Sequence, residues 1–101
     1  MRHLECDQLV KCIDLYYCKK NVSILLEYMD QGSMTDIVSS YHTNYSEEFC
    51  KYTLYQVALG LKKMHDSNVL HRDIKSGNIL YSENGEIKIS DLGFACFLSK
   101  R

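Results

Sequence analysis

One string of polar side chains in the last third of the 101-residue chain has the types and spacing for phosphate chemistry. It reads His71-Arg72-Asp73-Ile74-Lys75-Ser76-Gly77-Asn78, and Asp91-Leu92-Gly93 follows. An aspartate with an ordinary pKa of about 3.9 is ionised at neutral pH and can accept a proton. A lysine offers a point charge to phosphate, and amide and carboxylate oxygens are ligands suited to Mg²⁺. The string therefore predicts a site for a metal-bound phosphate compound.

A predicted β-hairpin over residues 79–89 separates Asn78 from Asp91, and its register determines how far apart these two residues lie. If Asn84-Gly85 is a two-residue turn between strands 79–81 and 87–89, Leu80 lies opposite Ile89. Asn78 then lies opposite Asp91, roughly 5 Å away across the open end. We expect these two oxygen ligands to face each other.

The elements that must position these residues follow from the apolar pattern. Residues 9–17 and 22–29 are rich in Val, Ile, Leu and Tyr around Lys19-Lys20-Asn21, which predicts two antiparallel strands. Residues 34–40 fit a two-turn helix that Ser33 could cap. These segments precede the string in the chain, so we expect strands first and a short helix after them.

A long helix is predicted between the short helix and the string. Ser46 is its expected cap, with acidic residues 47 and 48 in the first turn, and residues 65–67 end it. The apolar positions expected on one buried face are spaced four and three apart, and they are Cys50, Leu54, Val57, Leu61 and Met64. With the hairpin after it, the fold class is α+β.

The charge composition disfavours nucleic acid and anionic membranes as binding partners. The formal net charge is −1, with 46% hydrophobic and 25% charged residues, so no basic footprint for nucleic acid or an anionic membrane surface is expected. A nucleic-acid-binding domain that stacks bases on the eight tyrosines is disfavoured for the same reason.

The odd count of five cysteines predicts that they are reduced residues that contribute to packing. No signal peptide or membrane span is apparent, and we expect a cytoplasmic location.

The string resembles the catalytic loop and metal-binding motif of eukaryotic protein kinases. The upstream run Leu26-Glu27-Tyr28-Met29-Asp30-Gln31-Gly32-Ser33-Met34 is similar to the hinge and following helix of the sterile-twenty group, PAK-like kinases especially. The lysine two residues after Asp73, Lys75, resembles the residue at this position of the loop in serine/threonine-type kinases. The resemblance covers the whole chain and implies a partial kinase fold: residues 1–29 from the end of the small lobe through the hinge, and 30–101 from the start of the large lobe through the metal-binding motif.

The resemblance implies a role for each residue of the string. Asp73 would be the catalytic base, and Lys75 would neutralise charge on the transferring phosphate. Asn78 and Asp91 would hold the Mg²⁺ ions that bridge the ATP phosphates. Arg72 would pair with a phosphorylated activation segment. His71 would be a buried, hydrogen-bonded packing residue without a part in the chemistry.

The resemblance also implies an adenine site. The backbone at Glu27 and Met29 would bind adenine, with Leu26 at the back of the pocket and Leu80 beneath the ring. Structural alternatives stay open: strand packing for the apolar side chains, turn capping for the aspartates and asparagine, and a solvated surface lysine for Lys75.

The chain also departs from the family pattern. It holds no Gly-x-Gly-x-x-Gly, no Val-Ala-x-Lys strand and no Ala-Pro-Glu motif, and Leu92 replaces the usual Phe. The expected function is that of a serine/threonine kinase fragment, whose reaction is phosphoryl transfer from MgATP to a protein hydroxyl. We expect the isolated chain to be inactive, because nothing clamps the phosphates from above. The alternative is a non-catalytic remnant or truncated product that acts as a binding module. A chaperone or a small GTPase pathway partner is implied by the family alone.

Overall fold

The computed structural model describes residues 6–41 and 46–98, and within them a strand pair comes first, two helices follow, and short strands come last, as expected for an α+β fold. The elements in chain order are β1 (Cys12–Cys18), β2 (Asn21–Leu26), α1 (Met34–Tyr41), α2 (Glu47–Asp66), β3 (Val69–Leu70), η2 (Ser76–Asn78), β4 (Ile79–Tyr81), β5 (Ile87–Ile89), η3 (Leu92–Phe94) and β6 (Cys96–Phe97). The strands form three antiparallel pairs, β1 with β2, β3 with β6 and β4 with β5. The predicted fold class is confirmed.

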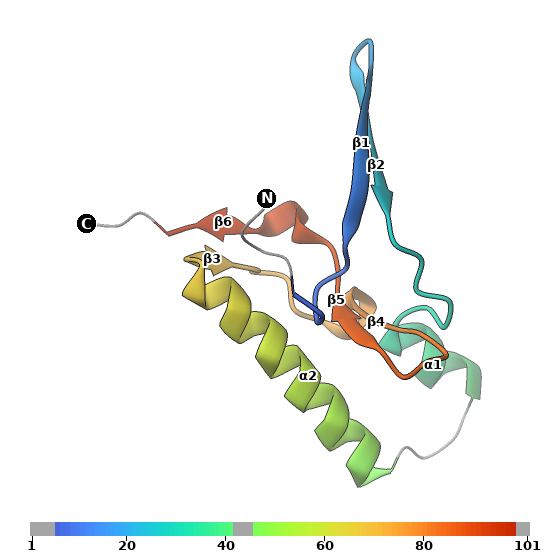
Figure 1. Ribbon diagram of the computed structural model, residues 1–101. Helices are drawn as coiled ribbons and strands as arrows, with labels where there is room; N and C mark the ends of the chain where they lie inside the picture. Colours follow the sequence, from blue (N-terminus) through green and yellow to red (C-terminus); the bar gives the residue numbers. More distant parts are fainter. Residues whose placement is uncertain (1–5, 42–45, 99–101) are drawn as a thin grey trace.

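The core lies where α2 packs along β5 and β3 (Figure 1). Its buried hydrophobic residues are Leu9, Val57, Met64, Val69, Ile79, Tyr81, Ile87 and Ile89. Leu9 was expected in the first strand. It lies instead beside β5, where Val10 N–H donates to the Ile89 carbonyl at 3.0 Å and Ile89 N–H donates to the Gln8 carbonyl at 2.8 Å. The segment before β1 is therefore part of the core beneath the hairpin.

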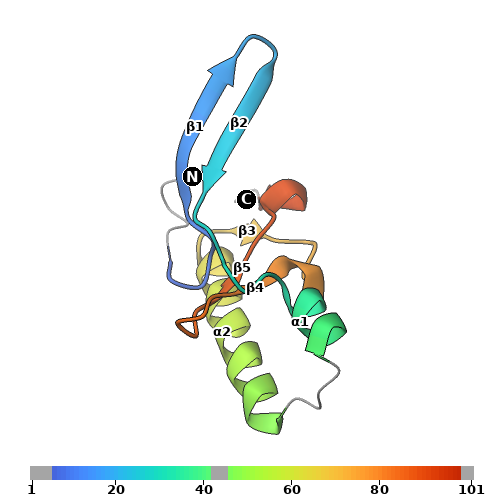
Figure 2. The same cartoon turned by 90° about the vertical axis from the view of Figure 1, so that its right-hand side faces the viewer.

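The β1–β2 hairpin extends away from this core (Figures 1 and 2). Every side chain of both strands is exposed, so the hairpin is held by its own ladder of backbone hydrogen bonds. The prediction that the cysteines are packing residues is wrong for Cys12, Cys18 and Cys50, which are exposed, although all five are free thiols as expected.

Helix α2 begins as predicted, because the Ser46 hydroxyl accepts the Phe49 N–H at 3.1 Å. Of the predicted buried positions, Val57 and Met64 are confirmed and Leu61 packs partly buried against the core, but the first half of the buried face is rotated relative to the prediction. Leu54 is 68% exposed and Cys50 is also exposed, whereas the buried positions are Thr53, Val57, Gly60 and Met64. The Thr53 hydroxyl shares a 3.0 Å hydrogen bond with the Tyr81 hydroxyl in the core. At Gly60, an added Cβ would lie 2.8 Å from Ile89 Cδ1, so a larger residue here would force the Ile89 side chain to shift. Neither contact can be predicted from the spacing of apolar residues, because one is made by a threonine and the other by a glycine.

The start of α1 confirms Ser33 as the cap. The Ser33 hydroxyl accepts the Asp36 N–H at 3.2 Å, and the Asp36 carboxylate accepts the Ser33 N–H at 2.9 Å in return. This reciprocal pair satisfies donors that the first turn leaves free. In the described part of the chain, no helix is long and apolar enough to cross a membrane.

The β4–β5 hairpin has a different register from the predicted one. Ile79 pairs with Ile89 and Leu80 with Lys88, so the predicted Leu80–Ile89 pair is wrong by one position. The cause is a three-residue loop, residues 83–85: Ser82 N–H donates to the Glu86 carbonyl at 3.0 Å, and Gly85 has a φ of 83°. This left-handed conformation favours glycine and adds the third residue to the turn.

Candidate active site

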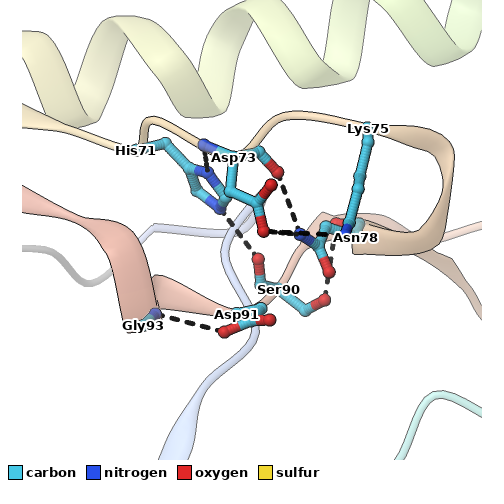
Figure 3. Close-up of polar contacts among 7 residues, drawn as sticks. All are labelled: His71, Asp73, Lys75, Asn78, Ser90, Asp91 and Gly93. Atoms are coloured by element: carbon cyan, nitrogen blue, oxygen red, sulfur yellow. Dashed lines mark hydrogen bonds and ion pairs between the residues drawn. The ribbon is translucent and has the colours of Figure 1, made fainter.

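His71 anchors the loop between β3 and η2. Its ring is 2% exposed, and Nδ1 accepts the Asp73 N–H at 3.1 Å. Because Nδ1 is an acceptor, the ring proton is on Nε2, which donates to the Ser90 carbonyl at 2.8 Å. The ring is buried and hydrogen-bonded on both sides, as the sequence predicted, and it ties the loop to the end of β5 (Figure 3).

Asp73 and Asn78 are joined by two hydrogen bonds. Asn78 Nδ2 donates to the Asp73 carbonyl at 2.9 Å and to Asp73 Oδ2 at 3.1 Å, and Figure 3 shows the two side chains facing each other. The 3₁₀ turn η2 brings Asn78 back toward Asp73, with Asn78 N–H donating to the Lys75 carbonyl at 2.9 Å. Asn78 Oδ1 and Asp73 Oδ1 accept no hydrogen bond from the residues that the structure describes. One amide oxygen and one carboxylate oxygen thus stay open to a ligand.

Lys75 lies beside this pair. Its Nζ is 3.8 Å from Asp73 Oδ2, and its side chain is 61% exposed, against 22% for Asp73. The lysine can therefore move toward an incoming anion without leaving a buried position. Its charge lies next to the carboxylate that would accept a proton.

Asp91 follows β5 after one residue, Ser90, and the corrected register changes its relation to Asn78. The residue opposite Asn78 is Ser90, whose N–H donates to the Asn78 carbonyl at 2.9 Å, so the predicted Asn78–Asp91 backbone pair is wrong. Asp91 has a φ of 61°, and its Oδ1 accepts the Gly93 N–H at 3.1 Å. A non-glycine residue in this left-handed region is strained, a condition found often at functional sites.

Arg72 links the same loop to the segment after Asp91. It has a φ of 67°, and its Nε donates to the Phe94 carbonyl at 2.6 Å. The predicted pairing of Arg72 with a phosphorylated residue stays a prediction. The structure shows a contact between Arg72 and Phe94, the last residue of η3.

The candidate adenine-binding segment, residues 27–29, connects β2 to α1. Glu27 N–H donates to the Lys11 carbonyl at 2.9 Å, and the Met29 carbonyl accepts the Gly32 N–H at 3.2 Å. The two groups left over, the Glu27 carbonyl and the Met29 N–H, form no hydrogen bond with described residues. They are an acceptor and a donor on one short stretch of backbone, which is what an adenine edge requires.

The side chains expected around adenine differ in how deeply they are buried. Leu26 is 49% exposed at the end of β2, whereas Met29 is buried. Leu80 is half-buried and lies on β4, where Ser33 bridges to it. The segment after the hinge is thus hydrogen-bonded to β4, which brings Leu80 to the hinge side of the hairpin.

Comparison with known proteins decides the family. The protein kinase domain family matches residues 1–101. The chain belongs to the protein kinase family. It is 40% identical over 100 residues to the serine/threonine-protein kinase STE20 of Candida glabrata, covering 99% of the chain and 11% of that protein. It is 37% identical over 97 residues to mitogen-activated protein kinase kinase 1c of Physcomitrium patens, covering 95% of the chain and 28% of that protein.

A third relative is the STE20 kinase of Saccharomyces cerevisiae, 39% identical over 92 residues, with 91% of the chain and 10% of that protein covered. The two STE20 relatives confirm the resemblance to the sterile-twenty group. The kinase segment spans between about a tenth and just over a quarter of the length of the relatives named here.

The donor atoms of the kinase loop fit a magnesium ion. Asn78 Oδ1 and the Asp91 carboxylate are hard oxygen ligands of the kind that Mg²⁺ takes. Among the described residues, no group of three or more His, Cys, Asp or Glu side chains could hold a metal ion. An ion here would therefore complete its shell with ATP phosphate oxygens and water, which is the usual arrangement for magnesium at phosphate-transferring sites.

One contact of the kinase hinge was not anticipated from the sequence. Lys88 on β5 is 8% exposed, and its Nζ lies 2.7 Å from Glu27 Oε1. Burial alone would raise the pKa of Glu27, but hydrogen bonds and charges from Lys88 and Lys11 hold that pKa below its ordinary value. For Lys88, burial acts to lower the pKa, and the bonds and charges of Glu27 and Glu86 outweigh it and raise the pKa. The only signal in the sequence is a lysine between two core isoleucines.

Proposed function

We propose that this chain is the central part of a serine/threonine protein kinase domain, whose reaction transfers the γ-phosphoryl group of MgATP to a protein serine or threonine hydroxyl. The observation that carries the proposal is the Asp73–Asn78 pair. Asn78 Nδ2 binds one carboxylate oxygen of Asp73 at 3.1 Å, so the other oxygen is held in a fixed direction and free to accept a proton. This is the geometry that a positioned general base needs.

The remaining residues of the loop support the same reaction. Asp73 accepts the proton of the attacking hydroxyl, and Lys75, whose Nζ lies 3.8 Å from Asp73 Oδ2, places its positive charge where the phosphoryl group passes. Asn78 and Asp91 would hold magnesium, which when bound neutralises charge on the ATP phosphates. The hinge groups of Glu27 and Met29 would bind the adenine edge. Positioning and charge stabilisation together provide most of the catalysis in such a site.

The test is a chimera in which residues 1–101 replace the matching segment of the Candida glabrata kinase. We expect transfer of radiolabelled phosphate to serine or threonine peptides, and little transfer to a tyrosine peptide of otherwise identical sequence. The parent kinase, assayed in parallel, is the matched control.

A folded chimera that binds MgATP but transfers no phosphate would overturn the proposal. That outcome would favour the alternative of a non-catalytic binding module.

We also propose further partners and a location for the chain. The sterile-twenty resemblance supports a protein substrate and a place in a small GTPase pathway, and the exposed apolar side chains of β1 and β2 are a reason to propose a chaperone. A cytoplasmic location is also proposed, and the free thiols of all five cysteines agree with it. Imaging of a fluorescent fusion would test the location.

A further inference from the structure

The ion pair between Glu27 and Lys88 joins two parts of the chain that are 61 residues apart. Glu27 is in the hinge, and Lys88 is the middle residue of β5. Ile87 and Ile89 point toward the α2 core, so the alternation of the strand places Lys88 on the opposite face, toward the hinge. The side chains of the pair are 10% exposed for Lys88 and 26% for Glu27, so little water screens them.

The same carboxylate oxygen holds a third segment. Glu27 Oε1 also accepts the Lys11 N–H at 2.7 Å, while Glu27 N–H donates to the Lys11 carbonyl at 2.9 Å. Glu27 is therefore fixed by its backbone and by its side chain at once. The bond to Lys88 is the only one of these three that connects the hinge to the β4–β5 hairpin.

The far end of the hinge is tied to the same hairpin. Gln31 N–H donates to the Tyr81 carbonyl at 3.0 Å, and Tyr81 N–H donates to the Gly32 carbonyl at 2.9 Å. Between these anchors lie the two free backbone groups, the Glu27 carbonyl and the Met29 N–H. Lys88 thus fixes one end of this stretch and Tyr81 the other, which sets the direction of both free groups relative to the hairpin.

We propose that Lys88, acting through the Glu27 carboxylate, is a positioning residue for the adenine-binding edge of the hinge. The inference rests on the proposed function, because it assumes that the free hinge groups bind the base. Hydrogen bonds weaken steeply when their angle is lost, so a small rotation of Glu27 would weaken the bond from the adenine 6-amino group to the Glu27 carbonyl. The phosphate contacts come from the loop at residues 73–78 and from Asp91, and they would not change.

The test compares ATP with purine riboside triphosphate, which lacks the 6-amino group, as substrates of the chimera. Lys88→Met removes the ion pair and keeps a long side chain. We expect the KM for ATP to rise about tenfold, the value of one well-made hydrogen bond, with the KM for purine riboside triphosphate changed less than twofold and kcat for either substrate little altered. The preference for ATP is the readout, because a merely structural loss would weaken both nucleotides alike.

Glu86→Gln is the matched control. Glu86 Oε2 lies 3.7 Å from the same lysine and its side chain is 52% exposed, but it makes no link to the hinge. This variant should keep the wild-type preference. If Lys88→Met does not fold, Glu27→Gln, which keeps the shape and removes the charge, provides the same comparison.

An unchanged preference for ATP in a folded Lys88→Met chimera would overturn the inference. So would an equal loss for the two nucleotides. If the unsubstituted chimera binds nucleotides without transferring phosphate, the proposed function fails, and the ratio of the two dissociation constants still decides the role of Lys88.

Discussion

Replacing Asp73 by asparagine should abolish most of the activity while leaving most of the stability. In the chimera we expect kcat to fall by roughly 10²- to 10⁴-fold, the range for removal of a positioned general base. This corresponds to about 3 to 5 kcal/mol of transition-state stabilisation. MgATP affinity should stay close to that of the unsubstituted chimera, because Asn78 and Asp91 remain.

The structure sets the expected change in stability. The asparagine oxygen can still accept the Asn78 Nδ2 bond, now 3.1 Å long, so a charge-assisted hydrogen bond becomes a neutral one, a loss of roughly 1 kcal/mol. The ion pair with Lys75 is 3.8 Å long and its lysine is 61% exposed, which makes it worth less than about 1 kcal/mol. The total is smaller than the expected loss in the transition state.

The assay is steady-state phosphate transfer together with thermal unfolding of each variant. Asp66→Asn is the matched control, because it makes the same chemical change at an exposed i, i+4 ion pair with Lys62, 2.8 Å long, which has no bond to the residues of the loop. A rate for Asp73→Asn within threefold of the unsubstituted chimera would refute the reasoning. A rate loss matched by unfolding at the assay temperature would also refute it.

Three further predictions concern the metal, the pH dependence and the core. Asp91→Ala should weaken nucleotide binding in the presence of Mg²⁺ and leave binding without Mg²⁺ nearly unchanged, and a titration in both conditions measures this. Because the pKa of Glu27 is lowered in the folded protein, its pair with Lys88 stabilises the fold fully at pH values above the unfolded-state pKa of 4.5. This stabilisation is lost as the pH falls through the pKa of Glu27 in the folded state. Because the pKa of Lys88 is raised, the pair loses its positive charge only when the pH rises beyond 10.5. Urea unfolding should therefore show Glu27→Gln less stable than wild type near neutral pH, with the difference vanishing in acid, and a constant difference would contradict the pairing. Met64→Ala, at a fully buried position, should cost about 2 to 5 kcal/mol in the free energy of unfolding, whereas Leu54→Ala, 68% exposed, should change it by about 0.5 kcal/mol or less.

Local rules were enough for the parts of the fold that depend on neighbouring residues. The caps at Ser33 and Ser46 are confirmed because a cap is a contact within four residues. The elements α1, α2 and the β4–β5 hairpin lie where periodicity and turn residues placed them, and the string at residues 71–78 identified the loop that joins Asp73 to Asn78. In each case the interactions that determine the structure lie between residues that are close together in the sequence.

Only the tertiary structure decided how these elements face one another. The choice of a three-residue loop around Gly85 moved the hairpin register by one position and placed Ser90 opposite Asn78, since two-residue and three-residue turns use the same residue types. The buried face of α2 depends on Gly60 meeting Ile89, and the bond between Glu27 and Lys88 joins residues 61 positions apart. Such contacts depend on which surfaces come together in three dimensions, and neither residue of a distant pair specifies the other.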